Sequence, residues 1–494
     1  MIKIIKKKYN TMSLPIKAAI WFTISSFLLK SVSFITAPIF TRIIPPAQYG
    51  LLSVFLSYQQ LFIIFATWEV QQGAYQKGLF TFNGNIRHFT SSTQSLANIL
   101  TICFFLIVFF FEDFFYTITG MSRSILICLF FYSLVSPAYN LWVIRKRTVY
   151  AYKPALAVSW LYSISTIIIS MIALLVIEKT ANIKLASTLI TASILGIIFF
   201  LPNANYTKLF INWKETKKHW IFLISFQGPL VFHSLSYLVL SQADRIMIGK
   251  MVGTSQVAFY SVAYNLAIVI SLFQNSINMS LTPWRYQMLE EKKYEKIKNT
   301  TWNLLLAVAI IIFAFVLVAP EVMRLMFTED YYEAIWCIPP ISVSVYYLFL
   351  YSIFVNIETY FDKTKYIMYV SVVCAVLNIV LNYYGIMLFG YIASAYTTLI
   401  SYILFAIGHF YFMSKICKNK ILVDSILNRQ AILIVSISFT LLSISVTFLY
   451  SYPVIRYGII ILIIASLFIL YVRNPKILHN ILKFSKLNDE SREK

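Results

Sequence analysis

Apolar runs long enough to cross a lipid bilayer recur fourteen times along this chain of 494 residues. A membrane-spanning helix needs about 20 mostly apolar residues to cross the hydrocarbon core. The runs lie at 14–36, 47–67, 92–111, 124–144, 155–177, 183–201, 220–240, 257–279, 302–319, 335–355, 366–388, 390–413, 431–450 and 454–472. Only 12% of the residues are charged, about half the share in a soluble domain. The sequence therefore predicts an all-α polytopic membrane protein, and it excludes a cytosolic enzyme and a secreted disulfide scaffold.

The basic residues predict how the chain is oriented in the membrane. With the N-terminus placed in the cytoplasm and the runs alternating, 31 of the 41 lysines and arginines fall in cytoplasmic segments and eight fall on the opposite side. Cytoplasmic loops of membrane proteins carry this excess. The net charge of +22 is thereby explained by topology, so no nucleic-acid partner is predicted. Both termini are expected in the cytoplasm, and the first run, which follows Lys6–Lys8, is expected to be a retained anchor.

The segments between the runs are too short to form catalytic domains. None much exceeds 20 residues, and none contains a glycine-rich phosphate-binding loop or a cluster with metal-ligand spacing. The five cysteines are scattered and have no metal or disulfide pattern. We therefore predict no catalytic residue, no metal and no cofactor. A membrane polysaccharide polymerase or ligase is disfavoured but stays an alternative.

The first six runs and the next six are predicted to be two copies of one unit. Thr41-Arg42-Ile43 after the first run is matched by Asp244-Arg245-Ile246 after the seventh. Because six is even, both copies enter the membrane from the same side, and the repeat is parallel. We expect an N-terminal lobe at 1–212, a C-terminal lobe at 213–418, and two further helices with a basic cytoplasmic tail at 419–494. Two such lobes enclose a central cleft.

Two motifs connect this sequence to a known family. The segment Phe34-Ile-Thr-Ala-Pro-Ile-Phe-Thr-Arg42, followed by Tyr49-Gly50, resembles the opening of Wzx-type polysaccharide flippases. Asp244-Arg-Ile-Met-Ile-Gly249, followed by Tyr260-Ser-Val-Ala-Tyr264, resembles their second-lobe signature. These flippases belong to the multidrug/oligosaccharidyl-lipid/polysaccharide (MOP) exporter superfamily, so the resemblance implies a MATE-like fold. The activity it implies is movement of an undecaprenyl-diphosphate-linked oligosaccharide from the inner to the outer leaflet.

Three cations are candidates for binding the substrate diphosphate. Lys30 lies within the first run, where an ionisable group costs about 2.5–3.5 kcal/mol at mid-depth. Arg42 and Arg245 occupy matching positions in the two copies. The alternative for Lys30 is an anchor whose charged end reaches the interface. The alternative for the two arginines is structural pairing at the membrane rim.

Three amides at helical spacing are candidates for binding sugar hydroxyl groups. Gln274, Asn275 and Asn278 lie within one turn of the eighth run and can share a face. Buried amides need hydrogen-bond partners, and joining neighbouring helices is the alternative role.

Four titratable residues are candidates for coupling transport to an ion gradient. Glu69 and Glu358 come at the inner ends of runs, Asp244 precedes Arg245, and His233 lies at mid-depth after Gly228-Pro229. The alternatives are rim structure for the glutamates and a helix contact for His233. No carboxylate is expected deep within a span, which disfavours an ion-coupled drug or small-molecule antiporter.

The leading hypothesis is a lipid-linked oligosaccharide flippase of the bacterial inner membrane that works by alternating access. Its partners would be the undecaprenyl-diphosphate-linked oligosaccharide, the phospholipid bilayer, and the polymerase and chain-length proteins of polysaccharide (O-antigen or lipopolysaccharide) assembly. The sequence does not specify the sugar repeat unit or the driving ion.

Overall fold

The computed structural model describes residues 13–204, 211–421 and 426–473, and in these ranges the regular structure is helical. The helices are α2 (Leu14–Ile43), α3 (Pro46–Thr67), α4 (Gly73–Thr81), α5 (Ile86–Phe110), α6 (Glu112–Thr119), α7 (Arg123–Thr148), α8 (Tyr152–Val176), α9 (Ala181–Phe200), α11 (Trp213–Met251), α12 (Thr254–Glu290), α13 (Tyr294–Met326), α14 (Ile338–Tyr360), α15 (Thr364–Phe389), α16 (Ala393–Ile421), α17 (Arg429–Leu449) and α18 (Pro453–Arg473), with short 3₁₀ turns η1 (Asn83–Asn85), η2 (Leu201–Asn203) and η3 (Glu329–Cys337).

The first thirteen predicted spans are confirmed as helices long and apolar enough to cross a membrane. The fourteenth falls on α18, whose described apolar stretch, Pro453–Leu462, is shorter.

Several helices begin or end at residues that favour helix ends. Pro46 opens α3, where a missing N–H costs nothing. Gly390 ends α15 with a φ of 74°, a conformation that glycine adopts readily.

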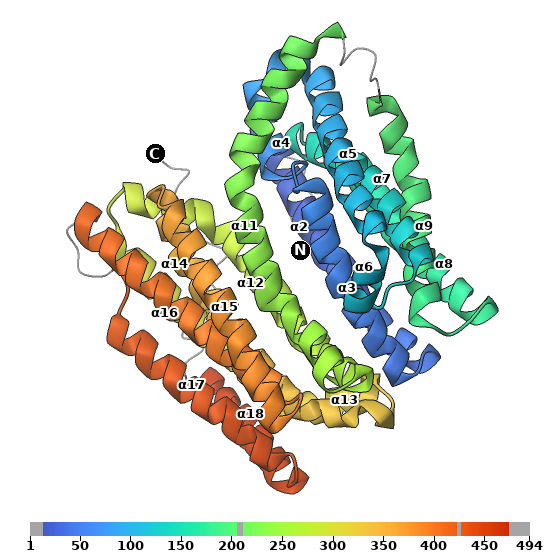
Figure 1. The fold of residues 1–494 in the computed structure, drawn as a ribbon. Coiled ribbons are helices and arrows are strands. Elements are labelled where there is room, and N and C mark those ends of the chain that lie inside the picture. Colours follow the sequence, from blue (N-terminus) through green and yellow to red (C-terminus); the bar gives the residue numbers. More distant parts are fainter. Residues whose placement is uncertain (1–12, 205–210, 422–425, 474–494) are drawn as a thin grey trace, which may run out of the picture.

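The helices form two groups with α11 and α12 between them (Figure 1). Helices α2–α9, coloured blue to teal, lie on one side, and α13–α18, coloured yellow to red, lie on the other. Helix α12 packs on both α3 and α14, and α11 packs on both α3 and α15. The proposed boundary between the two lobes, at residues 212/213, lies at the start of α11. This long helix contacts both groups along its length.

Helix α11 is long enough to cross the whole membrane and extend beyond it. Its 39 residues span about 58 Å at about 1.5 Å per residue. Its first half packs on the N-terminal group, where Trp220 Nε1 donates to the Ser92 carbonyl at 2.9 Å and Gln227 Oε1 accepts from the Ala74 N–H at 3.2 Å. Its second half packs on α15 and α16. Pro229 lies between the two halves, inside the helix.

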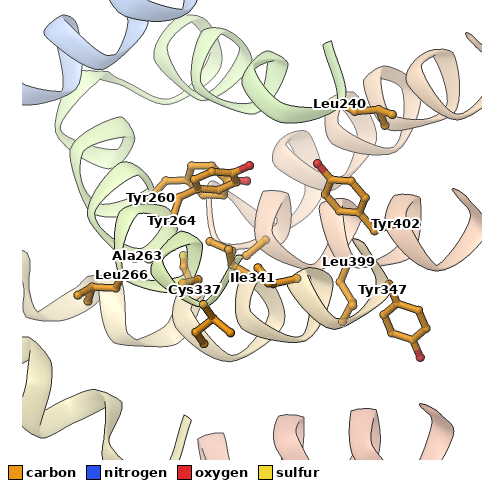
Figure 2. Close-up of a cluster of buried hydrophobic side chains, with 14 of the residues drawn as sticks. Leu240, Tyr260, Ala263, Tyr264, Leu266, Cys337, Ile341, Tyr347, Leu399 and Tyr402 are labelled. Carbon is orange, nitrogen blue, oxygen red and sulfur yellow. The ribbon is translucent and has the colours of Figure 1, made fainter. Parts of the chain in front are cut away.

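The core of the C-terminal group is rich in tyrosine. Figure 2 shows Tyr260 and Tyr264 projecting from α12 toward Tyr402 on α16. All three rings are buried. A buried phenol gains apolar contact through its ring but needs a polar partner for its hydroxyl, so this core has polar groups at its centre. One of those groups, Asp244, is described below.

Helices α3 and α12 come into tight contact at Gly50, near their N-terminal ends, which the predicted orientation places on the outer side of the membrane. A Cβ atom at this position would lie 1.6 Å from the Thr254 carbonyl oxygen and 2.9 Å from the Ala258 nitrogen. Both atoms belong to the backbone, which cannot rotate out of the way. Glycine is therefore required for the outer ends of the two helices to close on each other.

Replacing Gly50 by alanine is expected to open this contact. Overpacking costs about 1–3 kcal/mol, and the strain is relieved when α3 and α12 separate at their outer ends. Ser271, which lines the central cavity, can report this opening. In a background with the five native cysteines replaced, Ser271→Cys should react several-fold faster with a membrane-impermeant maleimide added from outside when Gly50→Ala is present. Gly458→Ala is the control, because a Cβ atom there meets nothing within 4 Å. Equal rates in the two variants would contradict the idea that this contact closes the outer side.

Candidate functional site

A cavity of about 610 Å³ lies between the two groups of helices. Helices α2, α3, α8 and α9 line it from one side, and α11 and α12 from the other. Its polar and charged lining residues are Thr36, Tyr49, Ser53, Gln60, Lys184, Tyr237, Gln242, Arg245, Ser261, Asn265, Ser271 and Asn275. This set contains two cations and no carboxylate, so within the described residues the wall of the cavity is positive.

Arg245 is held firmly in this wall. Its Nε donates to Ser261 Oγ at 3.2 Å, and its Nη1 donates to the Ser241 carbonyl at 2.9 Å and to Gln242 Oε1 at 2.8 Å. The guanidinium lies 4.5 Å from the centroid of the Tyr264 ring. These hydrogen-bond partners are neutral and orient the guanidinium, which also interacts electrostatically with the buried Asp244 carboxylate. An arginine in this setting can bind a phosphate group through paired N–H donors.

Lys184 on α9 supplies the second cation, and sequence reasoning missed it. Its Nζ donates to Ser170 Oγ at 2.6 Å and lies 3.9 Å from the centroid of the Phe40 ring. Here again the partners are neutral. The residue falls near the predicted outer end of the sixth run, where a lysine is ordinarily an interfacial anchor. The sequence alone carries no sign that it turns toward the cleft.

The other two predicted cations do not join Arg245. Arg42 has an exposed side chain and is not among the residues that line the cavity. Arg42 and Arg245 have matching positions in the two proposed copies, but only Arg245 lies in the cavity wall. Lys30 belongs to α2, but its side chain lies outside the described part of the structure.

The three predicted amides are brought together at a second, smaller cavity of about 110 Å³. Gln274, Asn275 and Asn278 all line it, and Asn275 also lines the larger cavity. Asn278 Nδ2 donates to Ser352 Oγ on α14, so this amide joins two helices. Gln274 Nε2 is buried without a hydrogen-bond partner among the described residues, so it has a free donor.

Asp244 does not face the cavity but joins four helices within the C-terminal group. Its side chain is fully buried. It accepts hydrogen bonds from Tyr260 Oη at 2.5 Å, Asn382 Nδ2 at 2.5 Å and Thr398 Oγ1 at 2.9 Å. These donors come from α12, α15 and α16. A carboxylate with three donors fixes the relative positions of the helices that carry them.

Glu358 forms a buried pair with a residue that sequence reasoning missed. His409 Nδ1 lies 3.0 Å from Glu358 Oε2 and 3.2 Å from Oε1, and neither side chain is exposed. Asp244 and Glu358 are thus two carboxylates buried within the protein. His233 on α11 is close enough to His409 to interact electrostatically, and its Nδ1 lies 3.3 Å from Ser371 Oγ.

Glu69 lies apart from the other candidates, just after α3. It has a φ of 51° and accepts a hydrogen bond from Gln72 Nε2 at 2.9 Å. Burial raises the pKa of its carboxyl above the ordinary value, and a hydrogen bond with Ser234 on α11 partly offsets this. The residue therefore connects the inner end of α3 to α11.

The polysaccharide biosynthesis protein family matches residues 16–289, and the MatE family matches residues 229–384. The first match covers more than half of the chain. This protein belongs to the polysaccharide biosynthesis protein family.

Individual relatives are distant in sequence but similar in fold. An uncharacterized membrane protein of Haemophilus influenzae is 23% identical over 72% of this chain and 87% of its own length. The lipid II flippase MurJ in an inward closed conformation superposes with a TM-score of 0.67, at 14% identity, over 93% of this chain and 100% of that chain. An inward-facing multidrug resistance MATE family transporter of the MOP superfamily gives a TM-score of 0.54, at 10% identity, over 83% and 96%. The fold of this family member is therefore similar to those of the lipid II flippase and the MATE family transporter, and its many long apolar helices make it a multi-pass membrane protein.

Proposed function

We propose that this polysaccharide biosynthesis family protein moves an undecaprenyl-diphosphate-linked oligosaccharide from the inner to the outer leaflet of the bacterial inner membrane. The observation that carries the proposal is the positive cavity between the two helix groups, lined by Arg245 and Lys184 without a carboxylate. A diphosphate is the anionic group of such a lipid, and two oriented cations match its charge. The amides of both cavities supply donors and acceptors for sugar hydroxyl groups.

Alternating access follows from closure at one end of the molecule. Gly50 and Thr254 bring α3 and α12 into contact at their outer ends. We infer that this arrangement accepts substrate from the inner side and that separation of the outer ends releases it. The polyprenyl chain would stay in the lipid while the head group crosses through the cavity.

A drug or small-molecule antiporter is the second candidate. The MatE match and the two buried carboxylates, Asp244 and Glu358, favour it. Neither carboxylate lines the cavity, however, and the cavity wall would repel a cationic drug. A membrane polymerase or ligase gains no support from the site, because the cavity wall lacks the acid–base pair that glycosyl transfer ordinarily uses.

The proposed setting follows the charge distribution of the sequence. Both termini would lie in the cytoplasm, and the polymerase and chain-length proteins of O-antigen or lipopolysaccharide assembly would receive the product. We propose no cofactor, no metal and no nucleic-acid partner.

A leaflet assay tests this function. The purified full-length protein is reconstituted in liposomes that contain a fluorescent undecaprenyl-diphosphate oligosaccharide, and a membrane-impermeant lectin or glycosidase measures how much glycan reaches the other side. Protein-dependent movement without ATP is expected. Export of an ethidium-type cation without movement of any glycan lipid would favour the antiporter instead.

A further inference from the structure

The carboxyl of Glu358 and the imidazole of His409 form the most deeply buried acid–base pair in the described part of the chain. They come from α14 and α16, which pack on each other more extensively than any other two described helices. Both side chains are 0% exposed. His409 Nδ1 faces the two carboxylate oxygens at 3.0 and 3.2 Å.

The charge balance of this pair depends on a single proton. His409 Nε2 is buried and has no hydrogen-bond partner within the described residues. Among those residues, the imidazole therefore has a hydrogen-bond partner only in Glu358. A carboxylate beside a neutral imidazole leaves one negative charge in a water-free interior, which is costly. One added proton makes the pair neutral overall, as a carboxylate and an imidazolium joined by a hydrogen bond. The enclosed arrangement therefore favours the pair with that proton bound.

The groups around the pair are mostly aromatic and uncharged at neutral pH. The Phe405 and Tyr351 rings lie 4.7 and 5.0 Å from the His409 ring. The packed helices carry titratable and charged residues that include His233, Tyr237, Asp244 and Arg245 on α11, Arg285 and Tyr286 on α12, Tyr294 on α13, Tyr346, Tyr347, Tyr351 and Tyr360 on α14, Lys365, Tyr366, Tyr369 and Cys374 on α15, Tyr402, Tyr411, Lys415, Cys417 and Lys418 on α16 and Arg429 on α17. Among them, His233 is close enough to His409 to interact with it electrostatically, and the Tyr351 ring contacts the His409 ring.

Tyr351 connects the pair to the transport cavities. Its ring contacts His409 on one side, and the residue also lines the smaller cavity beside Asn275 and Asn278. That cavity shares Tyr237, Ser271 and Asn275 with the larger one. If the Tyr351 ring moved, water from the smaller cavity would therefore reach Glu358 and His409.

We propose that Glu358 and His409 form a proton-binding site, reached from the central cavity past Tyr351, which takes up and releases one proton in each transport cycle. The proton comes from water and returns to water on the other side of the membrane, so no other reactant is needed. The coupling to transport rests on the proposed function, but the binding of the proton does not. A rearrangement of α14 against α16 would hydrate the pair and free its proton, which ties the protonation state to the conformation.

Nuclear magnetic resonance of the full-length protein with isotope-labelled histidine tests proton binding directly. The chain has five histidines, and His409→Gln identifies the signal of His409. We expect this imidazole to be doubly protonated near neutral pH in the wild type and to lose the second proton in Glu358→Gln, which keeps the hydrogen-bond acceptor but removes the charge. Glu215→Gln is the matched control, because Glu215 also lies beside histidines, with Oε2 at 3.7 Å from His88 Nε2, but is half-exposed. A His409 signal that stays singly protonated from about pH 5 to 8, or one unchanged by Glu358→Gln, would overturn the proposal.

The leaflet assay run with and without a pH gradient tests the coupling. The wild type and Glu215→Gln should move the glycan lipid faster under a gradient of one direction, and Glu358→Gln and His409→Gln should lose this response. Retention of the full response in Glu358→Gln would overturn the coupling. If the wild type binds the proton but moves no glycan lipid, the proposed function and its coupling fail while the proton site stands.

Discussion

Replacing Arg245 by alanine is expected to reduce the rate of lipid-linked oligosaccharide flipping by about 10- to 100-fold. A hydrogen bond to a charged group contributes about 1.5–3 kcal/mol, and each 1.4 kcal/mol is about a tenfold change. The guanidinium is oriented by Ser261, Ser241 and Gln242, none of which neutralises it. Under the proposed function, this guanidinium binds the diphosphate. The measurement is the initial rate of movement in the leaflet assay, at equal amounts of reconstituted protein.

Arg42→Ala is the matched control for this prediction. Arg42 has the corresponding position in the first copy, but it is exposed and lies outside the cavity wall, so its removal should leave the rate nearly unchanged. Arg245→Lys, which keeps the charge but loses the paired donors, should fall between the wild type and Arg245→Ala. Equal rates for Arg42→Ala and Arg245→Ala would contradict the assignment of the cavity as the diphosphate site.

Replacing Asp244 by alanine is expected to cause the largest loss of stability. The substitution removes the acceptor that Tyr260, Asn382 and Thr398 share. Asn382 keeps a bond to Asn378 Oδ1 at 3.2 Å, and the two hydroxyl groups, 3.4 Å apart, keep only each other. Each unsatisfied buried group costs about 1–3 kcal/mol, so the total loss should be several kcal/mol. The result should be a clear drop in the thermal unfolding temperature of the detergent-solubilised protein, measured by intrinsic fluorescence, together with lower expression.

Glu295→Ala serves as the reference for that measurement. Glu295 is exposed and pairs with Lys298 on the same helix at 3.2 Å, and such surface pairs contribute about 0–1 kcal/mol. Its unfolding temperature should match that of the wild type. If Asp244→Ala unfolds at the same temperature as Glu295→Ala, Asp244 does not hold the four helices together.

The membrane-spanning architecture could be predicted from the sequence because it rests on local properties. Length and apolarity of a segment decide whether it crosses a bilayer, and these are visible in each run without knowledge of its neighbours. The runs at 366–388 and 390–413 predict a break at residue 389, and α15 ends at Phe389.

The sequence could not predict how each helix is rotated about its own axis. This rotation determines which side chains face the cavity and form the site. Arg42 and Arg245 are each followed by isoleucine at matching positions of the two proposed copies, yet only Arg245 lines the cavity. Lys184 faces inward from a position where lysine is ordinarily an anchor. His409 lies 51 residues from Glu358, and no spacing in the chain indicates their pairing. The three amides were predicted together because one helical turn keeps them on one face.

The two-sided packing of α11 has a consequence for inhibition. Its arm before Pro229, near Trp220, is attached to the N-terminal group. Its arm after Pro229 is attached through Asp244 to α15 and through Gln242 to Ser57 on α3. If the second arm separates from α3 while the first stays in place, this helix must bend, and Pro229 is the weak point at which bending costs least. An antibody fragment that stiffens the first arm would stop the cycle without competing with the substrate. The same helix thus offers a way to block the protein noncompetitively, at a surface away from the cavity that Arg245 lines.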